Sequence, residues 1–502
     1  MESAEKKDTQ PNHSLLTTHY SLLTTHYSLL TTHYSLLTTH YSLLTTHHSP
    51  LSTVYPKFKR AAALLATLVV SLAPLRAQDT PEVPQTLDLQ TTLEFALEHN
   101  FAIQTALETI REQEGLIVEV KSRALPTLAL NSSYRQLDEG LSDTGGGLFP
   151  ATTESWSITL SARQALYEGG GIQAALDVQD LLRESALLSL ESTILDALLE
   201  VRTRYYAAIL SRDQIGVEEQ NVQLLEETLA NAKLRREAGD VSDFEVLRAE
   251  VLLANAQPAL IRRRGAYRVS IEQLRQSMGY QNYRRDSLNL NRVPELTDTL
   301  VYEPIDYDLE TGLQTALAER AELKQLAAIT KAREAGLKIA DSGRRPSVDL
   351  VGTYGKQRSN FSSAFDDAPE GWTIGIEASW NIWDGNKTRG QKLQALSQLE
   401  QSRIQQESLR LAIEVQVRQA ISALQEADQL AQAAVKVVEQ AEEALRMADS
   451  RFTTGSISQL DVLEARVALT EARTNALAAN YQHLVAKAQF RRAIAAETIQ
   501  HP

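Results

Sequence analysis

Two matching stretches decide the fold of this chain: WSITLSARQALYEG at residues 156–169 and WTIGIEASWNIWDG at residues 372–385. In each stretch apolar and polar side chains alternate, which predicts a β-strand with one apolar and one polar face. Strands of membrane barrels turn the apolar face to lipid and the polar face inward. These stretches hold all four tryptophans, as expected of aromatic side chains at a bilayer interface: Trp156, Trp372, Trp380 and Trp383. The alternative is an ordinary sandwich core that buries them.

A second pair of segments recurs at the same spacing. GDVSDFEVLRA at 239–249 returns as GSISQLDVLEA at 455–465. The two segments are separated by the same number of residues as Trp156 and Trp372, and we call this separation the tryptophan spacing. Two matches in one register indicate an internal duplication. Pro126 corresponds to Pro346 at a slightly longer spacing, the proline spacing, so the first copy has a longer loop, where added length is tolerated. The predicted domains are a first repeat, a linker and a second repeat, at 85–290, 291–304 and 305–498.

Each copy also predicts one very long helix. Helical periodicity almost free of breakers covers 172–237 and 388–453, about 66 residues or roughly 100 Å each, which does not fit a compact globule. The helical segments 91–124 and 243–278 are about half as long, so two of them stacked end to end match one long helix. The second long helix carries an alanine-rich seam for coiled-coil packing at Ile421, Leu424, Ala427, Ala431, Ala434, Val438, Ala441, Leu445 and Ala448.

The N-terminal segments are not expected to belong to the fold. Residues 1–53 contain a near-perfect repeat of His-Tyr-Ser-Leu-Leu-Thr-Thr, a low-complexity segment predicted to be disordered or to precede the true translation start. Residues 54–77 have the pattern of a secretory signal peptide. Basic residues precede an apolar run at 61–75, which is too short to span a bilayer comfortably. The mature chain is therefore expected to be exported.

Composition argues against several kinds of site. The chain has no cysteine, and most of its ten histidines lie in the N-terminal repeat, so we expect no metal site and no cofactor. The formal net charge of −14 argues against a protein that follows the phosphates of a nucleic acid. No acid, base and nucleophile set converges in the sequence, so we do not expect an enzyme.

The predicted strands must pair with strands of other subunits. Each chain supplies four, which cannot close a barrel, and an open strand edge is not tolerated in lipid. A dimer would give eight strands, which fill their own interior, whereas a trimer would give twelve, which leave a lumen. The long helices would extend such a passage well beyond the bilayer.

The mature chain resembles the TolC-type outer-membrane efflux protein family from about residue 87 to residue 497. The motifs that carry the resemblance are ALPTL at 124–128, LYEGG at 166–170, IWDG at 382–385 and the two turns that begin at Gly239 and Gly455. The resemblance implies a mainly α fold with a β-barrel portion. Its members are homotrimers in which a twelve-stranded outer-membrane β-barrel, four strands per chain, continues into a long periplasmic α-helical barrel.

The function implied by the resemblance is that of a passive exit duct in the Gram-negative outer membrane, extending into the periplasm. It would serve a tripartite efflux or type I secretion system. Its partners would be two further copies, outer-membrane lipid, a periplasmic membrane-fusion adaptor and an inner-membrane pump of the RND, ABC or MFS type. The alternative is a periplasmic coiled-coil adaptor or structural protein of such a complex. Adaptors carry one hairpin between small β-domains, whereas this chain has two hairpins flanked by amphipathic strands.

By the same resemblance, the two glycine turns are the periplasmic tips at which an adaptor docks. The docking residues would be Gly239, Val241, Ser242, Gly455, Ile457 and Ser458. The glycines end long helices, where a left-handed backbone is expected, and the serines are plausible N-caps of the helices that follow. The alternative is a helical hairpin without a docking role, but both copies keep the turn.

Asp461 and Glu464 are candidates for the periplasmic entrance. The resemblance places an acidic pair at these positions, where three subunits form carboxylate rings that attract cations. Glu245 holds the acidic partner position in the first copy. The alternative is that carboxylates at the start of a helix are favoured simply by the helix dipole. The family closes its entrance with a tyrosine and an arginine where this chain has Phe452 and Ile457, so the same link is not expected.

Overall fold

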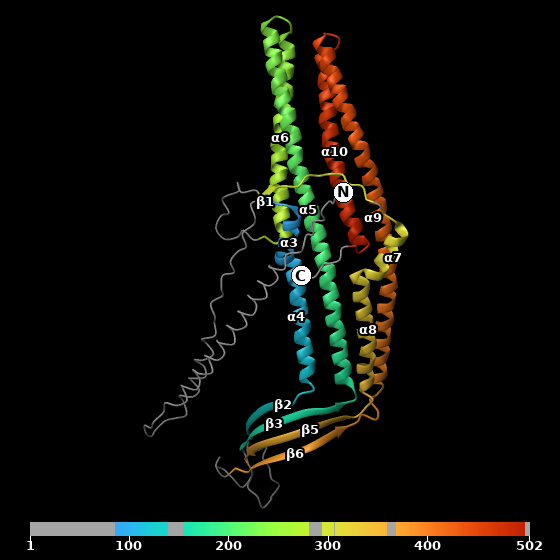
Figure 1. The fold of residues 1–502 in the computed structure, drawn as a ribbon. Coiled ribbons are helices and arrows are strands. Elements are labelled where there is room, and N and C mark those ends of the chain that lie inside the picture. Colours follow the sequence, from blue (N-terminus) through green and yellow to red (C-terminus); the bar gives the residue numbers. More distant parts are fainter. Residues whose placement is uncertain (1–85, 139–153, 281–293, 306, 359–367, 497–502) are drawn as a thin grey trace, which may run out of the picture. The chain divides into compact units, whose positions relative to one another are not determined.

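The computed structural model describes residues 86–138, 154–280, 294–305, 307–358 and 368–496 (Figure 1). They form the order helix, helix, strand, strand, helix, helix twice, and a two-residue strand precedes each set. The segments predicted as a low-complexity repeat and a signal peptide, 1–53 and 54–77, lie outside the described residues. Within the described ranges, no helix has both the length and the apolar character needed to cross a bilayer.

The two sets of elements have matching bounds. The first set is β1 (Thr86–Leu87), α3 (Leu89–His99), α4 (Phe101–Ser122), β2 (Thr127–Gln136), β3 (Glu154–Glu168), α5 (Gly171–Glu237) and α6 (Asp243–Met278). The second set is β4 (Glu295–Leu296), α7 (Leu309–Glu319), α8 (Ala321–Ser342), β5 (Ser347–Gln357), β6 (Glu370–Ser379), α9 (Lys387–Thr453) and α10 (Gln459–Ala493). Helices α3 and α4 precede α7 and α8 by the proline spacing, and α5 precedes α9 by the tryptophan spacing. The duplication found in the sequence is therefore a duplication of the structure.

One predicted helix is divided in two. The periodicity of 91–124 predicts a single helix, but the structure breaks it into α3 and α4 at Asn100. Asn100 has an extended backbone, with φ −63° and ψ 129°, and its side chain accepts hydrogen bonds from the N–H groups of Ala102 (2.8 Å) and Ile103 (3.3 Å). The break is stable because the asparagine satisfies N–H groups that a helix start leaves free. Arg320 stands at the corresponding break between α7 and α8.

The four longer strands form one antiparallel sheet in the order β2, β3, β5, β6. One face is apolar and pairs aromatic residues across strands, with Tyr134 opposite Trp156 and Tyr354 opposite Trp372. Large side chains of this face are between 67% and 72% exposed in the single chain: Leu128, Leu130, Trp372, Ile374 and Ile376. A face this apolar and this exposed needs lipid or another chain to cover it.

The other face of the sheet is polar. Hydroxyl groups join neighbouring strands between Ser133 and Ser157 (2.8 Å) and between Thr353 and Thr373 (2.6 Å). Near the helices, Arg163 donates to Asp349 at 2.7 Å. The predicted alternation of an apolar and a polar face is therefore present in all four strands.

The prediction that all four tryptophans lie on strands is wrong for two of them. Trp156 and Trp372 lie on β3 and β6, but β6 ends at Ser379, before Trp380 and Trp383. The pairing of β5 with β6 stops where Ser347 faces Ser379, so no described strand lies opposite the residues beyond. The indole N–H of Trp380 instead donates to the carbonyl oxygen of Arg344 at 3.0 Å.

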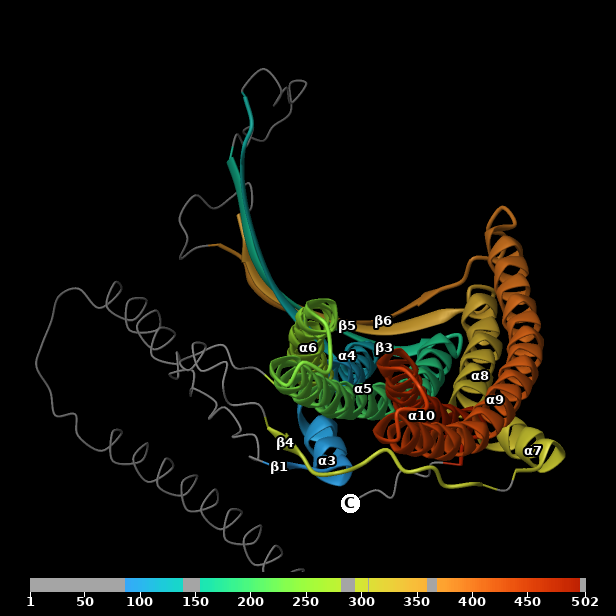
Figure 2. The same ribbon diagram turned by 90° about the horizontal axis from the view of Figure 1, so that it is seen from above.

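The helices pack as two long hairpins, each completed by a pair of shorter helices. Figure 1 shows α4 and α6 one after the other along α5, and α8 and α10 one after the other along α9. The predicted stacking of half-length helices against a long one is confirmed. Helix α5 also packs against α8 and α10, and Figure 2 shows these helices side by side.

The predicted seam of α9 is buried where α7 and α10 cover it. Ile421, Leu424, Ala427 and Ala431 are at most 6% exposed, and the first three pack with Phe490 in one apolar cluster. The remaining seam residues are half-buried: Ala434, Val438, Ala441, Leu445 and Ala448. A second cluster joins α5 and α6 to the short strands β1 and β4 through Val201, Tyr205, Ile271, Leu274, Leu87 and Leu296.

Candidate functional site

The first hairpin tip is the turn between α5 and α6. Gly239 has a φ of +84°, the left-handed conformation that commonly ends a helix. Ser242 occupies the N-cap position as predicted, but its side chain makes no capping hydrogen bond with a described residue. An ion pair between Arg236 and Asp243 joins the two helices there instead. Val241 is half-buried, whereas Ser242 is exposed.

The second tip, between α9 and α10, has the same backbone and different side-chain contacts. Gly455 has a φ of +74°. Ser458 and Asp461 form a reciprocal capping box. The Ser458 backbone N–H donates to Asp461 Oδ2 at 2.8 Å, and the Asp461 N–H donates to Ser458 Oγ at 3.4 Å. Ile457 is half-buried in the turn.

The three predicted entrance carboxylates have different surroundings. The hydroxyl and backbone N–H of Ser458 donate to Asp461 and lower the pKa of its carboxyl group. Glu464 lies on the next turn of α10 and is exposed. Glu245 lies on the other hairpin, half-buried in the first turn of α6. In a single chain, Asp461 therefore caps the start of α10, and Glu464 remains exposed.

Contacts that the sequence did not predict join the two hairpins near the tips. The guanidinium of Arg235, on α5, lies over the ring of Phe452, on α9, with its Cζ 5.4 Å from the ring centre. A cation–π contact at such a site contributes about 0.5–1 kcal/mol. Phe452 thus takes part in a link of a different kind from that of its family counterpart.

Two arginines of α10 connect α5 to α9 further from the tips. Arg473 donates to Gln220 on α5 at 2.8 Å and to Glu442 on α9 at 2.9 Å. Arg466 donates to Thr228 on α5 and lies 3.5 Å from Asp449 on α9. The partners on α5 are far from these arginines in sequence, so no local pattern could have revealed the contacts with α5.

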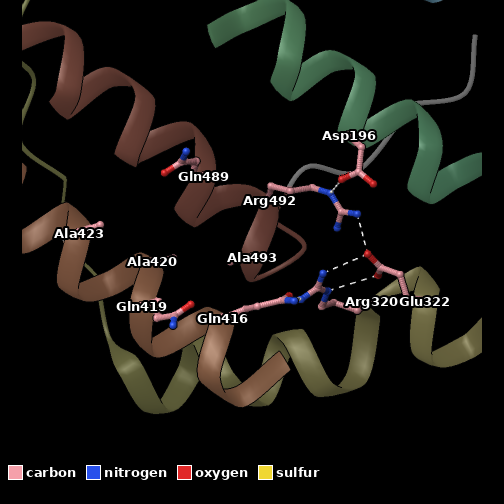
Figure 3. A pocket seen from close by; sticks show the side chains of 10 residues that line it. All are labelled: Asp196, Arg320, Glu322, Gln416, Gln419, Ala420, Ala423, Gln489, Arg492 and Ala493. Atoms are coloured by element: carbon pink, nitrogen blue, oxygen red, sulfur yellow. Dashed lines mark hydrogen bonds and ion pairs between the residues drawn. The ribbon is translucent and has the colours of Figure 1, made fainter. Parts of the chain in front are cut away.

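A polar junction lies where α5, α8, α9 and α10 meet, beside an open pocket of about 560 Å³ (Figure 3). Arg492 donates to Asp196 at 2.7 Å and to Glu322 at 2.6 Å. Arg320 donates to Glu322 at 3.0 Å and to Gln416 at 2.6 Å. Both arginine side chains are at most 9% exposed. Two arginines and two carboxylates balance in charge and join the two halves of the chain.

The junction holds one carboxyl group with a strongly shifted pKa. Burial alone would raise the pKa of Glu322, but hydrogen bonds from Arg320 and the charge of Arg492 lower it to about 2. Glu322 is therefore ionised at any physiological pH. The one sequence signal of the junction is Arg320, a charged residue at the helix break where the first half has Asn100.

The predicted interface aromatics lie at the two ends of the sheet. Trp156 and Trp372 are near the ends of β3 and β6 that are farther from the helices. Trp380 and Trp383 follow β6 on the way to α9 and are 61% and 83% exposed. Within the described part of the chain, no group of three or more His, Asp or Glu side chains is arranged as a metal site.

Among the described residues, the amphipathic sheet has no further strand beyond β2 and β6, and it is carried on helices of 67 residues, which is typical of an outer-membrane channel. The family model described as Outer membrane efflux protein matches residues 92–280 and 312–496, and the chain belongs to this family. The predicted family, the mainly α fold with a β portion and the outer-membrane location are confirmed: the protein is an outer-membrane efflux channel.

Known relatives cover most of the chain. The pyoverdine export outer membrane protein OpmQ of Pseudomonas putida is 23% identical over 402 residues, which is 77% of this chain and 81% of OpmQ. Outer membrane protein TolC of Escherichia coli is 23% identical over 404 residues, 75% and 76% of the two chains. The solved structure of the Campylobacter jejuni CmeC outer membrane channel aligns with 89% of this chain and 93% of its own, with a TM-score of 0.70 and 14% identity. This structural likeness shows the fold.

Proposed function

We propose that the chain is one subunit of a homotrimeric exit duct that passes small molecules or polypeptides from an inner-membrane pump to the outside. The observation that carries the proposal is the sheet with one apolar face, whose edge strands β2 and β6 have no outer partner among the described residues. Such a sheet is not stable in lipid until further strands close it. Three copies supply twelve strands, enough to leave a lumen. Transport through such a duct is passive, and the chain has no enzymatic role.

The long hairpins support a place in a tripartite efflux or type I secretion complex. Helices α5 and α9 have 67 residues each, or about 100 Å, and their tips lie at the end remote from the sheet (Figure 1). A channel of this length reaches deep into the periplasm. The partners there are a membrane-fusion adaptor and, through it, a pump of the RND, ABC or MFS type.

The adaptor docks at the two glycine turns. The positions that would form the docking surface are Gly239, Val241, Ser242, Gly455, Ile457 and Ser458. Three large apolar side chains near the first tip, Leu234, Phe244 and Leu247, are between 58% and 67% exposed. A hairpin that met only water would not place so much apolar surface there, which favours a docking role.

The acidic residues of the second tip line the periplasmic entrance. Glu464 is exposed and available to face the axis of a trimer, and Asp461 lies one turn earlier on α10. Three copies of this pair, with Glu245 from the other hairpin, give a negative constriction that favours cations.

The tryptophans anchor the sheet in outer-membrane lipid. Strand β6 is ten residues long, the length of a tilted strand that crosses a bilayer, with Trp372 near one end and Trp380 just past the other. Interface aromatics at both ends are typical of membrane barrels.

Membrane fractionation and a mass measurement in detergent test the proposal. We expect the full chain in the outer-membrane fraction, as a trimer that heating in SDS converts to monomer. A folded monomer or dimer would contradict the homotrimer. Recovery with inner-membrane or soluble periplasmic material would favour the adaptor alternative instead.

A further inference from the structure

The structure contains a template for the contact between subunits. We propose that β6 of one subunit pairs with β2 of the next in the register of β3 with β5, with Glu377 opposite Ser133 and Ser379 opposite Asn131. In the assembly this pairing extends β6 to Asp384. The inference rests on the proposed closure of the sheet by further copies and specifies which residues meet.

The first step is that the two strand hairpins have equivalent registers. In the first, Thr127 of β2 faces Arg163 of β3, and in the second, Ser347 of β5 faces Ser379 of β6. Ser347 follows Thr127 by the proline spacing, and Ser379 follows Arg163 by the tryptophan spacing. The spacings found in the sequence therefore relate the strands residue by residue.

Two side-chain hydrogen bonds at the end of the sheet, one in each copy, are related by the same two spacings. The side chain of Gln164 donates to the carbonyl oxygen of Ala124, and that of Trp380 donates to the carbonyl oxygen of Arg344. Trp380 follows Gln164 by the tryptophan spacing, and Arg344 follows Ala124 by the proline spacing. The two halves are thus equivalent in side-chain contacts that no local propensity would impose.

The second step concerns a difference in strand length between the copies. Strand β3 runs to Glu168, whereas β6 ends at Ser379, which corresponds to Arg163. Strand β3 pairs with β2 only as far as Arg163, and beyond it β3 pairs with β5 of the other copy. The portion that β6 lacks is therefore the portion that requires a neighbour from the other copy. For β6 that neighbour is β2 of the next subunit.

The third step transfers the register of β3 and β5 to this new pair. Ser161 faces Thr353, which corresponds to Glu377 facing Ser133, and Arg163 faces Val351, which corresponds to Ser379 facing Asn131. Beyond the register shift between Ala165 and Tyr167, Glu168 faces Ser347, which corresponds to Asp384 facing Thr127 of the next subunit after the same shift. Each transferred pair joins polar face to polar face, as a continuous barrel wall requires.

The turns beside the strands support the same contact. A Cβ built on Gly169 would lie 2.6 Å from the carbonyl oxygen of Ser342, so the first turn packs closely on the second copy. The corresponding Gly385 has no described atom within 4 Å of such a Cβ. The residue that corresponds to Ser342 in the first copy is Ser122, which is exposed in the single chain. The next subunit brings Ser122 to Gly385.

The backbone geometry makes the proposed pairs suitable for disulfide cross-linking. The N–H of Arg358 donates to the carbonyl oxygen of Trp156 at 2.8 Å, which marks the apolar-face positions of β3 and β5 as hydrogen-bonded pairs. The polar-face pairs alternate with them and are non-hydrogen-bonded, with Cα atoms about 4.5 Å apart. Disulfides accept that separation. Because the chain has no cysteine, only introduced thiols can react.

The experiment compares cysteine pairs in the full chain in outer membranes, oxidised and then run on a denaturing gel without reductant. The test variants are Glu377→Cys with Ser133→Cys, and Ser379→Cys with Asn131→Cys. Ser161→Cys with Thr353→Cys is the matched control, because these residues face each other within one subunit. Ser379→Cys with Ser133→Cys is the register-slipped control on the same face.

We expect both test pairs to yield covalent dimers and trimers, the matched control to stay at monomer mass, and the slipped pair to cross-link about tenfold less. Stronger cross-linking of the slipped pair would overturn the register. A detergent-stable trimer in which neither test pair reacts would overturn the inference and leave the proposed function standing. Monomeric material, with the matched control still oxidised within one subunit, would overturn both.

Discussion

The two hairpins have equivalent backbone conformations but are stabilised by different side-chain contacts. At the second tip Ser458 and Asp461 cap α10 reciprocally, whereas at the first tip Ser242 has no capping partner among the described residues. At the helix breaks before α4 and α8, Asn100 caps α4, whereas Arg320 joins an ion-pair network. The comparison shows that helix lengths and glycine turns carry the repeated architecture. The polar contacts that stabilise it can be exchanged, provided each copy satisfies its own.

Removing Arg492 should have the largest effect on stability. Arg492→Ala leaves the carboxylates of Glu322 and Asp196 without their shared partner, and we expect a loss of about 3 kcal/mol in the free energy of unfolding. Gln276, at the corresponding position of α6, is exposed, so Gln276→Ala should cost a few tenths of a kcal/mol. Urea unfolding in detergent, followed by circular dichroism, measures both. Equal losses would show that the two halves are held alike.

Acid should lower the stability of the second half of the chain by protonating Glu322. Because the pKa of Glu322 is lowered to about 2 from its ordinary 4.5, its contribution is complete above pH 4.5 and is lost as pH falls toward 2. We expect this contribution to the free energy of unfolding to be about 3 kcal/mol. Ala102 occupies the corresponding place in the first half and has no ionisable side chain. Unfolding free energies between pH 5 and pH 2 should therefore fall less steeply in Glu322→Gln than in the unmodified protein. Parallel curves would contradict this.

Substitution of the tip glycines should cost about 1–2 kcal/mol at either hairpin, because a side chain strains the left-handed backbone. Gly455→Val and Gly239→Val should still form trimers but lose export, measured as cargo released by cells that carry the cognate adaptor and pump. No described atom lies near either glycine, so the cost comes from the backbone rather than from a clash. Gly216→Val, in the middle of α5 and equally uncrowded, is the control and should keep export. Normal export by the tip variants would count against docking.

The N-cap serines should differ. Ser458→Ala removes a working capping box and should cost about 1 kcal/mol, whereas Ser242→Ala removes no capping bond to a described residue and should cost a few tenths. Thermal unfolding of the two variants side by side measures the difference. An equal loss would mean that both tips depend on their serines.

The entrance carboxylates should have the smallest effect on stability and a clear effect on conduction. Asp461→Asn with Glu464→Gln keeps side-chain size while removing up to six charges from a trimer. Single-channel recordings in a bilayer should show weaker cation selectivity and weaker block by divalent cations from the periplasmic side. Glu245→Gln, on the other hairpin, separates the contribution of the first tip. Unchanged selectivity and block in the double variant would reduce Asp461 and Glu464 to residues at a helix start.

Much of the architecture could be read from the sequence because it depends on local periodicity. The alternation at 156–169, the long helices and the buried seam of α9 follow from which side chains repeat every two or every three to four residues. The left-handed glycines at both tips and the cap by Ser458 were predictable for the same reason, since each depends on a few neighbouring residues. The constant spacing of the motifs also revealed how strands of one copy correspond to strands of the other.

Only the tertiary structure decided which distant groups meet. The link between Arg235 and Phe452 and the junction around Arg492 join residues more than a hundred positions apart, whose approach depends on how whole helices pack. The end of β6 at Ser379 is likewise set by whether a strand lies alongside it, because a strand is stabilised by its neighbour rather than by its own residues. The sequence determined the elements and their repetition by itself, whereas the contacts between them required the packed chain.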